Sequence, residues 1–382
     1  MTSDKHAAPL RVGIAGAPRG ARYVTGLRAC GDKARLHAVY DPSSEARKRF
    51  AADHGVDVVC TTYSQLLDES DLVIVASPQQ HHVPQAVAAL DAGVHVLSEV
   101  PAACSIEQAQ ELLAAYRRSS ARYMLAENYC YTRPNLVVAA MARAGLFGEL
   151  YFGEAAYLHE MKAYHHDAEG KPTWRYFWQV GRAAHTYPTH SLGPLLQWFG
   201  DRVSAVSCAG SGRHTDPEHE IDDTVVLLCR TSRGALLDVR LDLLSNRPHL
   251  MDYYGVQGTA GAYEAARAPD QTPRVHVAGR SPAGQWEPLD AYVEEFLPQR
   301  YRHPPRGAGH WGADAWPVLE FVQAIVTEGD VPIDVHAALD MSLPGIVSER
   351  SFAEGGTWVH VPDPRTWTAG IGVEPGREAP LA

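Results

Sequence analysis

The stretch LRVGIAGAPRGARYVTGLRACGDKARLHAVYD, residues 10–41, decides the fold. It opens with an apolar run that ends in Gly16, continues with helical spacing, and closes with a second apolar run that ends in Asp41. A strand, a helix and a strand at this spacing form a βαβ unit with parallel strands. In such a unit a pyrophosphate binds at the first turn, and an acid after the second strand reaches a ribose. The stretch therefore predicts the first half of a dinucleotide-binding domain.

The glycine pattern of the first turn departs from G-x-G-x-x-G, because the chain has GAPRGA at residues 16–21. Alone the motif is weak, and a plain strand turn is the alternative. Asp41 and the βαβ rhythm favour the nucleotide site. The Asp41 carboxylate would accept hydrogen bonds from a ribose diol and repel a 2′-phosphate, which favours NAD over NADP. In the turn itself we expect cofactor contacts from Gly16, Pro18, Arg19 and Gly20.

The alternation of strands and helices continues along the first third of the chain. Further buried parallel strands are expected in DLVIVASP (71–78) and VHVLSEVP (94–101). Helices are expected in SEARKRFAADHG (44–55), HHVPQAVAALDAG (81–93) and SIEQAQELLAAYRRS (105–119), the last with a capping box at Ser105 and Gln108. We therefore predict an α/β fold in which residues 1–125 form a doubly wound Rossmann domain.

The remaining two thirds of the chain follow a different pattern. Alternation with a period of two predicts strands in residues 150–161, 202–210, 223–244 and 249–265. Helical spacing returns in residues 135–148, 312–329 and 334–355. We predict a second α/β domain over residues 126–382 with an open, mainly antiparallel sheet. Residues 265–309 are rich in Pro and Gly, so we expect a long loop and consider it a candidate cover for the site.

Composition narrows the classes of function. The 382 residues are too many for one ordinary core, which agrees with two domains. A formal net charge of −11 argues against a nucleic-acid surface. Neither an N-terminal signal segment nor an uninterrupted apolar run of about 18 residues is visible, so we expect a cytoplasmic protein without a membrane span.

Cysteines and histidines bear on redox state and metals. The six cysteines lie far apart and form no CxxC pair, which is typical of reduced, buried thiols. The 19 histidines include the pairs 81–82 and 165–166, but neither pair has the spacing of a metal site. HEMKAYHH (159–166) lacks the HExxH pattern. We therefore predict no metal site, and a site formed by His159 and Glu160 with His165 and His166 is the alternative.

Six strings spread along the chain carry a family resemblance. They are ALDAGVHVLSEVPAA (89–103), AENYCY (126–131), RAGLFGELYFGEAAYLHEM (143–161), TYPTHSLGPLLQWFG (186–200), GHWGADAWPVLEFVQAI (309–325) and PIDVHAALDMSLPGIVSERSFAEGG (332–356). Together they resemble the Gfo/Idh/MocA oxidoreductase superfamily. Within it they are most similar to the NAD-dependent glycoside hydrolases of the α-N-acetylgalactosaminidase type. The resemblance implies an N-terminal Rossmann domain and a second domain whose sheet forms the substrate floor and often an oligomer interface.

Two departures separate the chain from most dehydrogenases of this superfamily. Those enzymes carry Glu-Lys-Pro where this chain has Glu99-Val100-Pro101, and they place an Asp four residues before the site histidine, where this chain has Thr186. A standard dehydrogenase uses the Lys to move the hydroxyl proton, so other groups must do so here. The glycosidase-like subgroup also lacks this Lys.

The resemblance implies a redox-neutral hydrolysis. NAD⁺ removes a hydride from C3 of a glycoside, the resulting ketone acidifies the C2 proton, and the aglycone leaves C1 once a base has removed that proton. Water then adds, and the hydride returns to C3. Groups that act first as a base and then as an acid are needed near neutral pH, which favours histidines and tyrosines of lowered pKa.

The resemblance assigns catalytic roles to Tyr157, His159, Tyr187, His190 and Glu127. Tyr157 and His159 alternate on one predicted strand, so their side chains share a face; an outward-facing pair is the alternative. Tyr187 and His190 lie at a helix start, where a capping or packing histidine is the alternative. Glu127 matches the family glutamate near the C3 hydroxyl, and a structural salt bridge is its alternative.

The resemblance also implies contacts on the nicotinamide side from Ser77, Pro78, Glu99 and Asn128. Substrate contacts are expected from Lys162, Trp174, Arg175 and His310. Asp314 either lines the pocket or caps a helix. Residues 159–190 are rich in basic side chains in an acidic chain, which suits an anionic substituent such as a sulfonate; ordinary surface charge is the alternative.

Three functions remain open at this stage. The leading one is an NAD-dependent glycosidase acting on a hexoside, for example a sulfoquinovoside or an N-acetylhexosaminide. The second is a net NAD-dependent dehydrogenase of a sugar or cyclitol, and the third is a non-catalytic NAD-binding regulator. We expect a small-molecule glycoside as the partner and a homo-oligomer, either a dimer or a tetramer.

Overall fold

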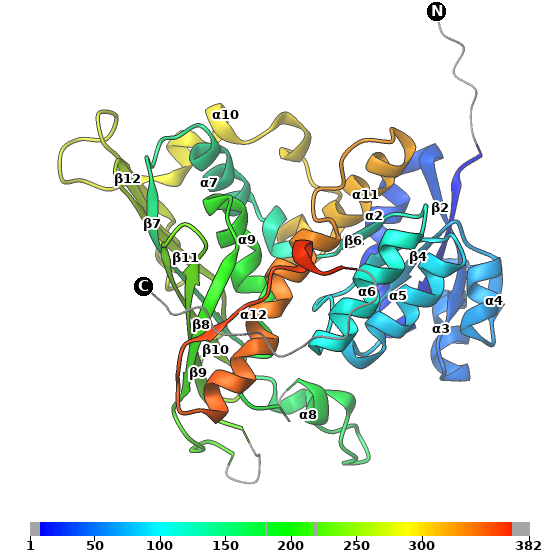
Figure 1. Cartoon of the computed structure of the whole chain (residues 1–382). Coiled ribbons are helices and arrows are strands. Elements are labelled where there is room, and N and C mark those ends of the chain that lie inside the picture. The colour runs from blue at the N-terminus through cyan, green and yellow to red at the C-terminus, as the bar shows by residue number, and fades with distance from the viewer. Residues whose placement is uncertain (1–7, 180–181, 217–220, 369–382) are drawn as a thin grey trace, which may run out of the picture.

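Two β-sheets organise the computed structural model, which describes residues 8–179, 182–216 and 221–368 (Figure 1). The N-terminal strands form the first sheet, and strands from the middle of the chain form the second (Figure 1). Helices α9 (Thr189–Phe199) and α12 (Val335–Ala353) lie between the two sheets (Figure 1). The predicted α/β fold is confirmed.

The first sheet has six parallel strands among the described residues, in the order β3-β2-β1-β4-β5-β6. The strands are β1 (Leu10–Ala15), β2 (Ala34–Tyr40), β3 (Val58–Cys60), β4 (Leu72–Val75), β5 (His95–Ser98) and β6 (Tyr123–Leu125). The helices that flank them are α2 (Val24–Ala29), α3 (Ser44–His54), α4 (Tyr63–Asp68), α5 (His82–Asp91) and α6 (Ile106–Arg118). This is the doubly wound Rossmann order, so the predicted fold of the first domain is confirmed.

Side-chain caps fix the starts of three of these helices, α3, α4 and α6. Ser105 Oγ accepts a hydrogen bond from Gln108 N at 3.1 Å, as the predicted capping box requires. Gln108 Oε1 reaches back to Cys104 N at 2.9 Å. Helix α3 begins at Ser44, as predicted. Its N-cap is the preceding residue, Ser43, whose Oγ accepts a hydrogen bond from Ala46 N at 3.2 Å. The short turn between β2 and α3 therefore holds Asp41 close to the sheet.

The second sheet has nine strands among the described residues, in the order β14-β13-β12-β11-β7-β10-β9-β8-β15. The strands are β7 (Leu150–Leu158), β8 (Val203–Gly210), β9 (Thr224–Thr231), β10 (Leu236–Asp242), β11 (Leu250–Gly258), β12 (Gly261–Glu264), β13 (Arg274–Val277), β14 (Glu287–Pro288) and β15 (Val359–His360). Only the pair β7 and β10 is parallel among these described strands. The predicted open, mainly antiparallel sheet is confirmed.

The C-terminal helices return to the first sheet. Helix α11 (Trp316–Val326) packs against α2, and α12 packs against both α6 and the second sheet. Leu125 N donates to Ile333 O at 3.0 Å, so the backbone before α12 continues the hydrogen bonding of β6. The predicted boundary between residues 125 and 126 stays a prediction.

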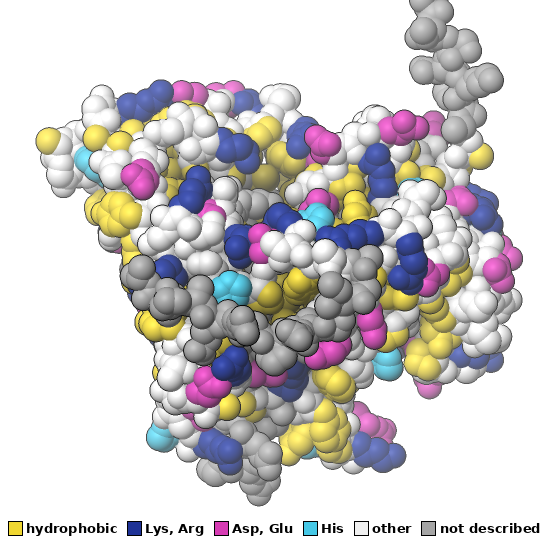
Figure 2. Space-filling model, in the orientation of Figure 1, with side chains coloured by type: hydrophobic (Ala, Val, Ile, Leu, Met, Phe, Trp, Pro, Cys, Tyr) yellow, Lys and Arg dark blue, Asp and Glu magenta, His cyan; other side chains and the backbone are white. Residues whose placement is uncertain are grey.

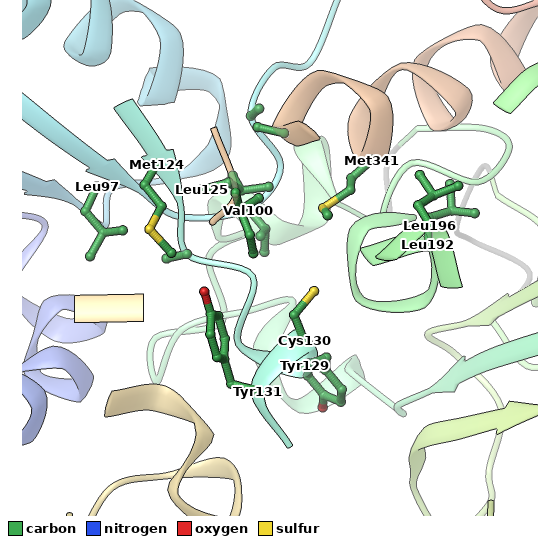
Figure 3. Close-up of a cluster of buried hydrophobic side chains, with 14 of the residues drawn as sticks. Leu97, Val100, Met124, Leu125, Tyr129, Cys130, Tyr131, Leu192, Leu196 and Met341 are labelled. Carbon is green, nitrogen blue, oxygen red and sulfur yellow. The ribbon is translucent and has the colours of Figure 1, made fainter. Parts of the chain in front are cut away.

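One hydrophobic core joins the two halves of the molecule (Figure 3). It combines side chains of the first sheet, of α9, of α12 and of η4 (Asn128–Tyr131), the 3-10 helix after β6. The residues labelled in Figure 3 are Leu97, Val100, Met124, Leu125, Tyr129, Cys130, Tyr131, Leu192, Leu196 and Met341. Burial on both sides of η4 fixes this turn relative to both sheets.

The prediction of a long loop at residues 265–309 is wrong in part. The segment contains β13, β14 and the short helix α10 (Val293–Phe296), and it extends the second sheet and packs against α7 (Arg133–Arg143). None of its residues lines the cavity described below, so it does not cover the site. Pro and Gly favour a loop in this segment, but the short run RVHV (274–277) contains two valines and pairs with β12 as an antiparallel strand.

Charge on the molecular surface is mixed. Figure 2 shows basic and acidic side chains interspersed over the face that it displays. None of the helices in the described part of the chain combines the length and apolar character that a membrane crossing requires.

Candidate active site

One cavity gathers most of the predicted site residues. It has a volume of ≈ 800 Å³ and lies where the carboxyl ends of the first sheet's strands face β7 and the start of α9. The predicted residues in its lining are Gly16, Pro18, Arg19, Asp41, Ser77, Pro78, Glu99, Asn128, Tyr157, His159, Trp174, Arg175, Tyr187, His190 and His310. Ligands of open α/β sheets bind at this edge. A second cavity of ≈ 360 Å³, along β11 and β12, contains none of the predicted residues.

Two glycines let the turn after β1 pack closely on its neighbours. Gly16 has a φ of 95°, and a Cβ at this position would stand 2.4 Å from Ala76 O, so only glycine fits. Gly20 does not line the cavity. A Cβ there would stand 2.2 Å from Ile14 Cγ2, so Gly20 allows close packing of the turn on β1. Pro18 lies in the first turn of α1 (Ala17–Gly20), where its missing N–H leaves no intrahelical bond unmade.

Asp41 anchors the same turn from the end of β2. Its carboxylate accepts hydrogen bonds from Ala17 N and Ser43 N, each at 2.9 Å. The side chain also lines the cavity, although the residue is only 7% exposed. A carboxylate oxygen accepts more than one hydrogen bond, so Asp41 can hold the turn and still accept from a ribose diol.

Glu99 is a buried carboxylate at the end of β5. It forms an ion pair with Arg19 and accepts a hydrogen bond from the Tyr23 hydroxyl at 2.5 Å. Burial alone would raise the pKa of Glu99, but the charge of Arg19 and the hydrogen bonds from Tyr23 and Arg19 outweigh burial and lower the pKa. The cavity therefore contains an ionised Glu99 paired with a cationic Arg19.

Backbone carbonyls hold the loop after β4. His82 lies between Ser77 O and Pro101 O, with each ring nitrogen 2.9 Å from one of these oxygens. The Ser77 hydroxyl donates to Gln85 Oε1 at 2.7 Å. Ser77 and Pro78 thereby occupy fixed positions in the lining next to Glu99.

His190 is fixed by a buried carboxylate. Its Nδ1 donates to Glu127 Oε1 at 2.7 Å, and the side chains are 7% and 0% exposed. Helix α9 has no side-chain cap, so the alternative that His190 caps this helix is wrong. Glu127 does not itself line the cavity, and its Oε2 has no hydrogen-bond partner among the described residues. Glu127 therefore orients the imidazole, and Nε2 is the nitrogen left to face a ligand.

Two tyrosines pack against the His190 ring. The ring centroids of Tyr157 and Tyr187 each lie 5.0 Å from that of His190. Burial raises the pKa of both hydroxyls, and the nearby Arg175 and Arg19 reduce this effect without reversing it. The expectation of tyrosines with a lowered pKa is therefore wrong for this protein. The uncompensated burial of two phenols explains the difference.

His159 is the neutral partner of Tyr157. The Tyr157 hydroxyl lies 3.0 Å from His159 Nδ1, which confirms that the two side chains share a face. Burial and the charges of His249, Arg175, His190 and His310 lower the pKa of His159 to about 4. Near neutral pH His159 is therefore unprotonated, and its Nδ1 can accept the hydrogen bond of the Tyr157 hydroxyl.

A second carboxylate–histidine pair lies opposite α9. His310 Nδ1 donates to Asp314 Oδ1 at 2.8 Å, and Asn128 Nδ2 donates to the same oxygen at 2.7 Å. Asp314 caps no helix, so that alternative is wrong. His310 and Trp311 have φ values of 48° and 56°, a conformation that costs about 1–2 kcal/mol per residue. The chain accepts this strain in the segment that brings His310 to the cavity.

The predicted substrate residues separate into two groups. Trp174 and Arg175 line the cavity from α8 (Trp174–Trp178), and the Arg175 guanidinium lies 4.6 Å from the Trp174 ring centroid. Gln179 Oε1 accepts from Arg175 Nη1 at 2.6 Å. Lys162 does not line the cavity, because its Nζ is bound by Leu244 O at 2.9 Å and by Asn246.

Sequence reasoning did not identify Tyr129, whose ring lies 4.4 Å from His190 and 5.7 Å from His310, measured between centroids. Its hydroxyl is buried without a hydrogen-bond partner among the described residues. The position of Tyr129 directly after Glu127 and Asn128 is the signal that could have found it. Arg22 and Gln179 also line the cavity and were not predicted.

The described residues contain no group of three or more His, Cys, Asp or Glu side chains placed to hold a metal ion. The six cysteines are buried and unpaired, as predicted.

Comparison with sequence families accounts for both halves of the chain. Residues 10–127 match the model of the oxidoreductase family with an NAD-binding Rossmann fold. Residues 131–369 match the model of the glycosyl hydrolase 109 C-terminal domain. The chain belongs to glycosyl hydrolase family 109. The predicted resemblance and the predicted NAD cofactor are both confirmed.

Two curated relatives each match more than three quarters of the chain. A family 109 protein of Solibacter usitatus is 34% identical over 328 residues, which cover 78% of this chain and 72% of that protein. The α-N-acetylgalactosaminidase of Shewanella oneidensis is 29% identical over 334 residues, with 79% and 71% covered.

Solved structures share the fold at lower identity. An oxidoreductase domain protein from Kribbella flavida has a TM-score of 0.80 at 21% identity, with 93% of this chain and 100% of that chain covered. Levoglucosan dehydrogenase in complex with NADH and levoglucosan has a TM-score of 0.78 at 20% identity, with the same coverage. At this identity the likeness shows the two-domain fold of a family 109 chain and no more.

Proposed function

We propose that this family 109 protein is an NAD-dependent glycosidase that hydrolyses a hexoside through transient oxidation at C3. The observation that carries the proposal is the His190–Glu127 pair, packed against Tyr157 and Tyr187, in the cavity that also contains the nucleotide turn. Val100 stands where dehydrogenases have their proton-moving Lys, so the proton transfers fall to these side chains.

The residues present fit the nucleotide. Gly16 lets the turn after β1 lie close to the backbone at Ala76, Asp41 offers carboxylate oxygens at the end of β2, and Arg19 and Arg22 place two cations in the same lining. We assign Gly16, Arg19 and Asp41 to the phosphates and ribose, and Ser77, Pro78 and Glu99 to the nicotinamide side. Bound NAD⁺ supplies a reversible exchange of a hydride with the substrate.

The protein's own groups handle the protons. Glu127 holds His190 Nδ1, which leaves Nε2 to exchange a proton with the sugar. Tyr157 is a protonated phenol whose hydroxyl faces neutral His159, so its oxygen can accept a substrate proton only as its own proton passes to that imidazole. Removal of the C2 proton beside the C3 ketone releases the aglycone from C1. Water addition and reduction at C3 then complete a redox-neutral cycle.

The substrate proposed is a hexoside with an N-acetyl or an anionic substituent. Arg175 supports the anionic class, because its guanidinium lines the cavity and forms no ion pair with an acid among the described residues. A planar fork of donors suits a sulfonate or carboxylate. Lys162 gives no support, because its bonds lead away from the cavity. Sulfoquinovosides and N-acetylgalactosaminides are the pair to compare.

A net dehydrogenase is the second candidate, because levoglucosan dehydrogenase shares the fold. Purified protein with 4-nitrophenyl glycosides separates the two. Aglycone release that depends on NAD⁺ without net NADH, together with deuterium exchange at C2, supports the glycosidase. Stoichiometric NADH from a free sugar would overturn it in favour of the dehydrogenase. NAD binding without either reaction would indicate a regulator.

We propose that the protein is a cytoplasmic homo-oligomer. Size-exclusion chromatography with light scattering tests the oligomeric state, and cell fractionation tests the localisation.

A further inference from the structure

One turn of the chain supports both histidines of the cavity. Glu127 bonds to His190, and the next residue, Asn128, bonds to Asp314, which in turn bonds to His310. The two carboxylate–imidazole distances are nearly equal, at 2.7 and 2.8 Å. Both imidazoles therefore have Nδ1 fixed, and both enter the same cavity lining.

The two pairs come from different elements of the fold. His190 belongs to α9, whereas His310 belongs to η8 (His310–Ala315), which packs against α2 and η4. The ring of Tyr129 lies against both imidazoles and is buried, so it sets their separation. A ligand in this cavity can therefore contact both histidines.

Exposure distinguishes the two histidines. The His190 side chain is 7% exposed, and the His310 side chain is 29% exposed. The neighbour of His310, Trp311, is 67% exposed. The carbons that are oxidised and deprotonated need a closed site, whereas the aglycone must leave through the open one. Of the two histidines, the more exposed His310 is the one better placed to meet a group that leaves the cavity.

Besides the transfer of the C3 hydroxyl proton, the elimination needs two separate proton transfers. One removes the proton from C2, and the other protonates the glycosidic oxygen as its bond to C1 breaks. The cluster of His190, Tyr157 and Tyr187 is assigned to the protons of the carbon centres that react. No member of it is assigned to protonate the glycosidic oxygen. The proposed function assigns no group to this step.

We propose that His310, positioned by Asp314 and Asn128, is the general acid that protonates the departing aglycone oxygen. This inference rests on the proposed glycosidase function. The electron pair of the C2–H bond forms the C1–C2 double bond, the pair of the C1–O bond goes to the aglycone oxygen, and that oxygen takes the proton of His310. On hydration the water oxygen bonds to C1 and returns a proton to His310, and C2 regains a proton from its base.

Leaving groups of graded acidity test this role. The wild type and His310→Gln are compared on 4-nitrophenyl, phenyl and methyl glycosides of the same sugar. Because nitrophenolate leaves without a proton, we expect kcat/KM to fall less than about 5-fold on the nitrophenyl glycoside and about 10²-fold or more on the methyl glycoside. Deuterium exchange at C2 should persist in the variant.

Matched variants exclude a structural explanation. His303→Gln removes an exposed histidine of the same segment and should match the wild type on every substrate. Asp314→Asn should show the same dependence on the leaving group as His310→Gln, with a smaller loss. NAD affinity and the melting temperature of each variant report on the fold.

The outcomes separate this inference from the proposed function. An equal loss on all three glycosides, or loss of C2 exchange in His310→Gln, overturns the role of His310 and leaves the glycosidase intact. Absence of NAD-dependent aglycone release in the wild type overturns the proposed function, and the role of His310 with it. Retained activity on the methyl glycoside overturns the general-acid role alone.

Discussion

Gly193 of α9 lies against Glu127, because a Cβ at position 193 would stand 2.8 Å from Glu127 Cγ. The same Cβ would stand 3.1 Å from Cys130 Sγ. A helix residue without a side chain thus allows α9 to approach η4 closely enough for the 2.7 Å bond between His190 and Glu127. The geometry of the proposed proton carrier depends on this contact.

The first prediction concerns Gly193→Ala. The added methyl group must displace Glu127 or α9, so turnover should fall about 10-fold or more, with a stability cost of about 1–3 kcal/mol. Gln197→Ala, at a partly exposed position on the same helix, is the control and should change neither quantity. A Gly193→Ala protein with unchanged turnover would show that the close approach is dispensable.

The second prediction concerns His190→Ala. Turnover should fall about 10²-fold or more, because a general acid–base group is lost, while NAD affinity stays within a factor of about two. Steady-state kinetics and isothermal titration with NAD measure the two effects. A large drop in melting temperature with weakened NAD binding would instead make His190 a packing residue.

The third prediction concerns Asp41→Ala. NAD should bind more weakly, and the preference over NADP should narrow, because the carboxylate that repels a 2′-phosphate is gone. The variant also leaves Ala17 N and Ser43 N without their acceptor, so we expect a loss of about 1–3 kcal/mol in stability. An unchanged NAD to NADP ratio would refute the ribose role.

The fourth prediction concerns pH. Burial lowers the pKa of His185 from 6.5 to about 4, and neither ring nitrogen has a hydrogen-bond partner among the described residues. The unfolded imidazole binds its proton below about 6.5, whereas the folded one resists it, so the free energy of unfolding should fall on acidification between these values. The loss is on the order of 3 kcal/mol by linkage.

Denaturation of His185→Phe between pH 7 and 4 tests this account. The variant should show a flatter decline with acidification than the wild type, since it has no imidazole to protonate. His303→Gln, which removes an exposed histidine, should follow the wild type. A parallel decline in His185→Phe would assign the acid sensitivity to other groups.

Local patterns were sufficient for the fold and for the nucleotide turn. Gly16 and Asp41 follow strands whose apolar runs show directly in the sequence, and a parallel sheet brings such strand ends together. Family resemblance supplied His190 and Glu127, whose contact spans 63 positions and has no local signal.

Features that depend on packing could not be predicted. The link from Asn128 to Asp314 joins residues 186 positions apart. The raised pKa of Tyr157 follows from how completely the fold buries the phenol, which composition does not show. Lys162 was grouped with Arg175 by charge, but the backbone carbonyl of Leu244 captures its ammonium group.

The hydrogen bond from Leu125 to Ile333 has a consequence for biosynthesis. The strands of the first sheet leave the ribosome early, but β6 lacks its neighbour until residues beyond 333 have emerged, and α11 arrives only shortly before. Until then the apolar face under α11 and α12 has no cover. The first sheet of a nascent chain therefore stays incomplete, with apolar surface uncovered, through most of its translation.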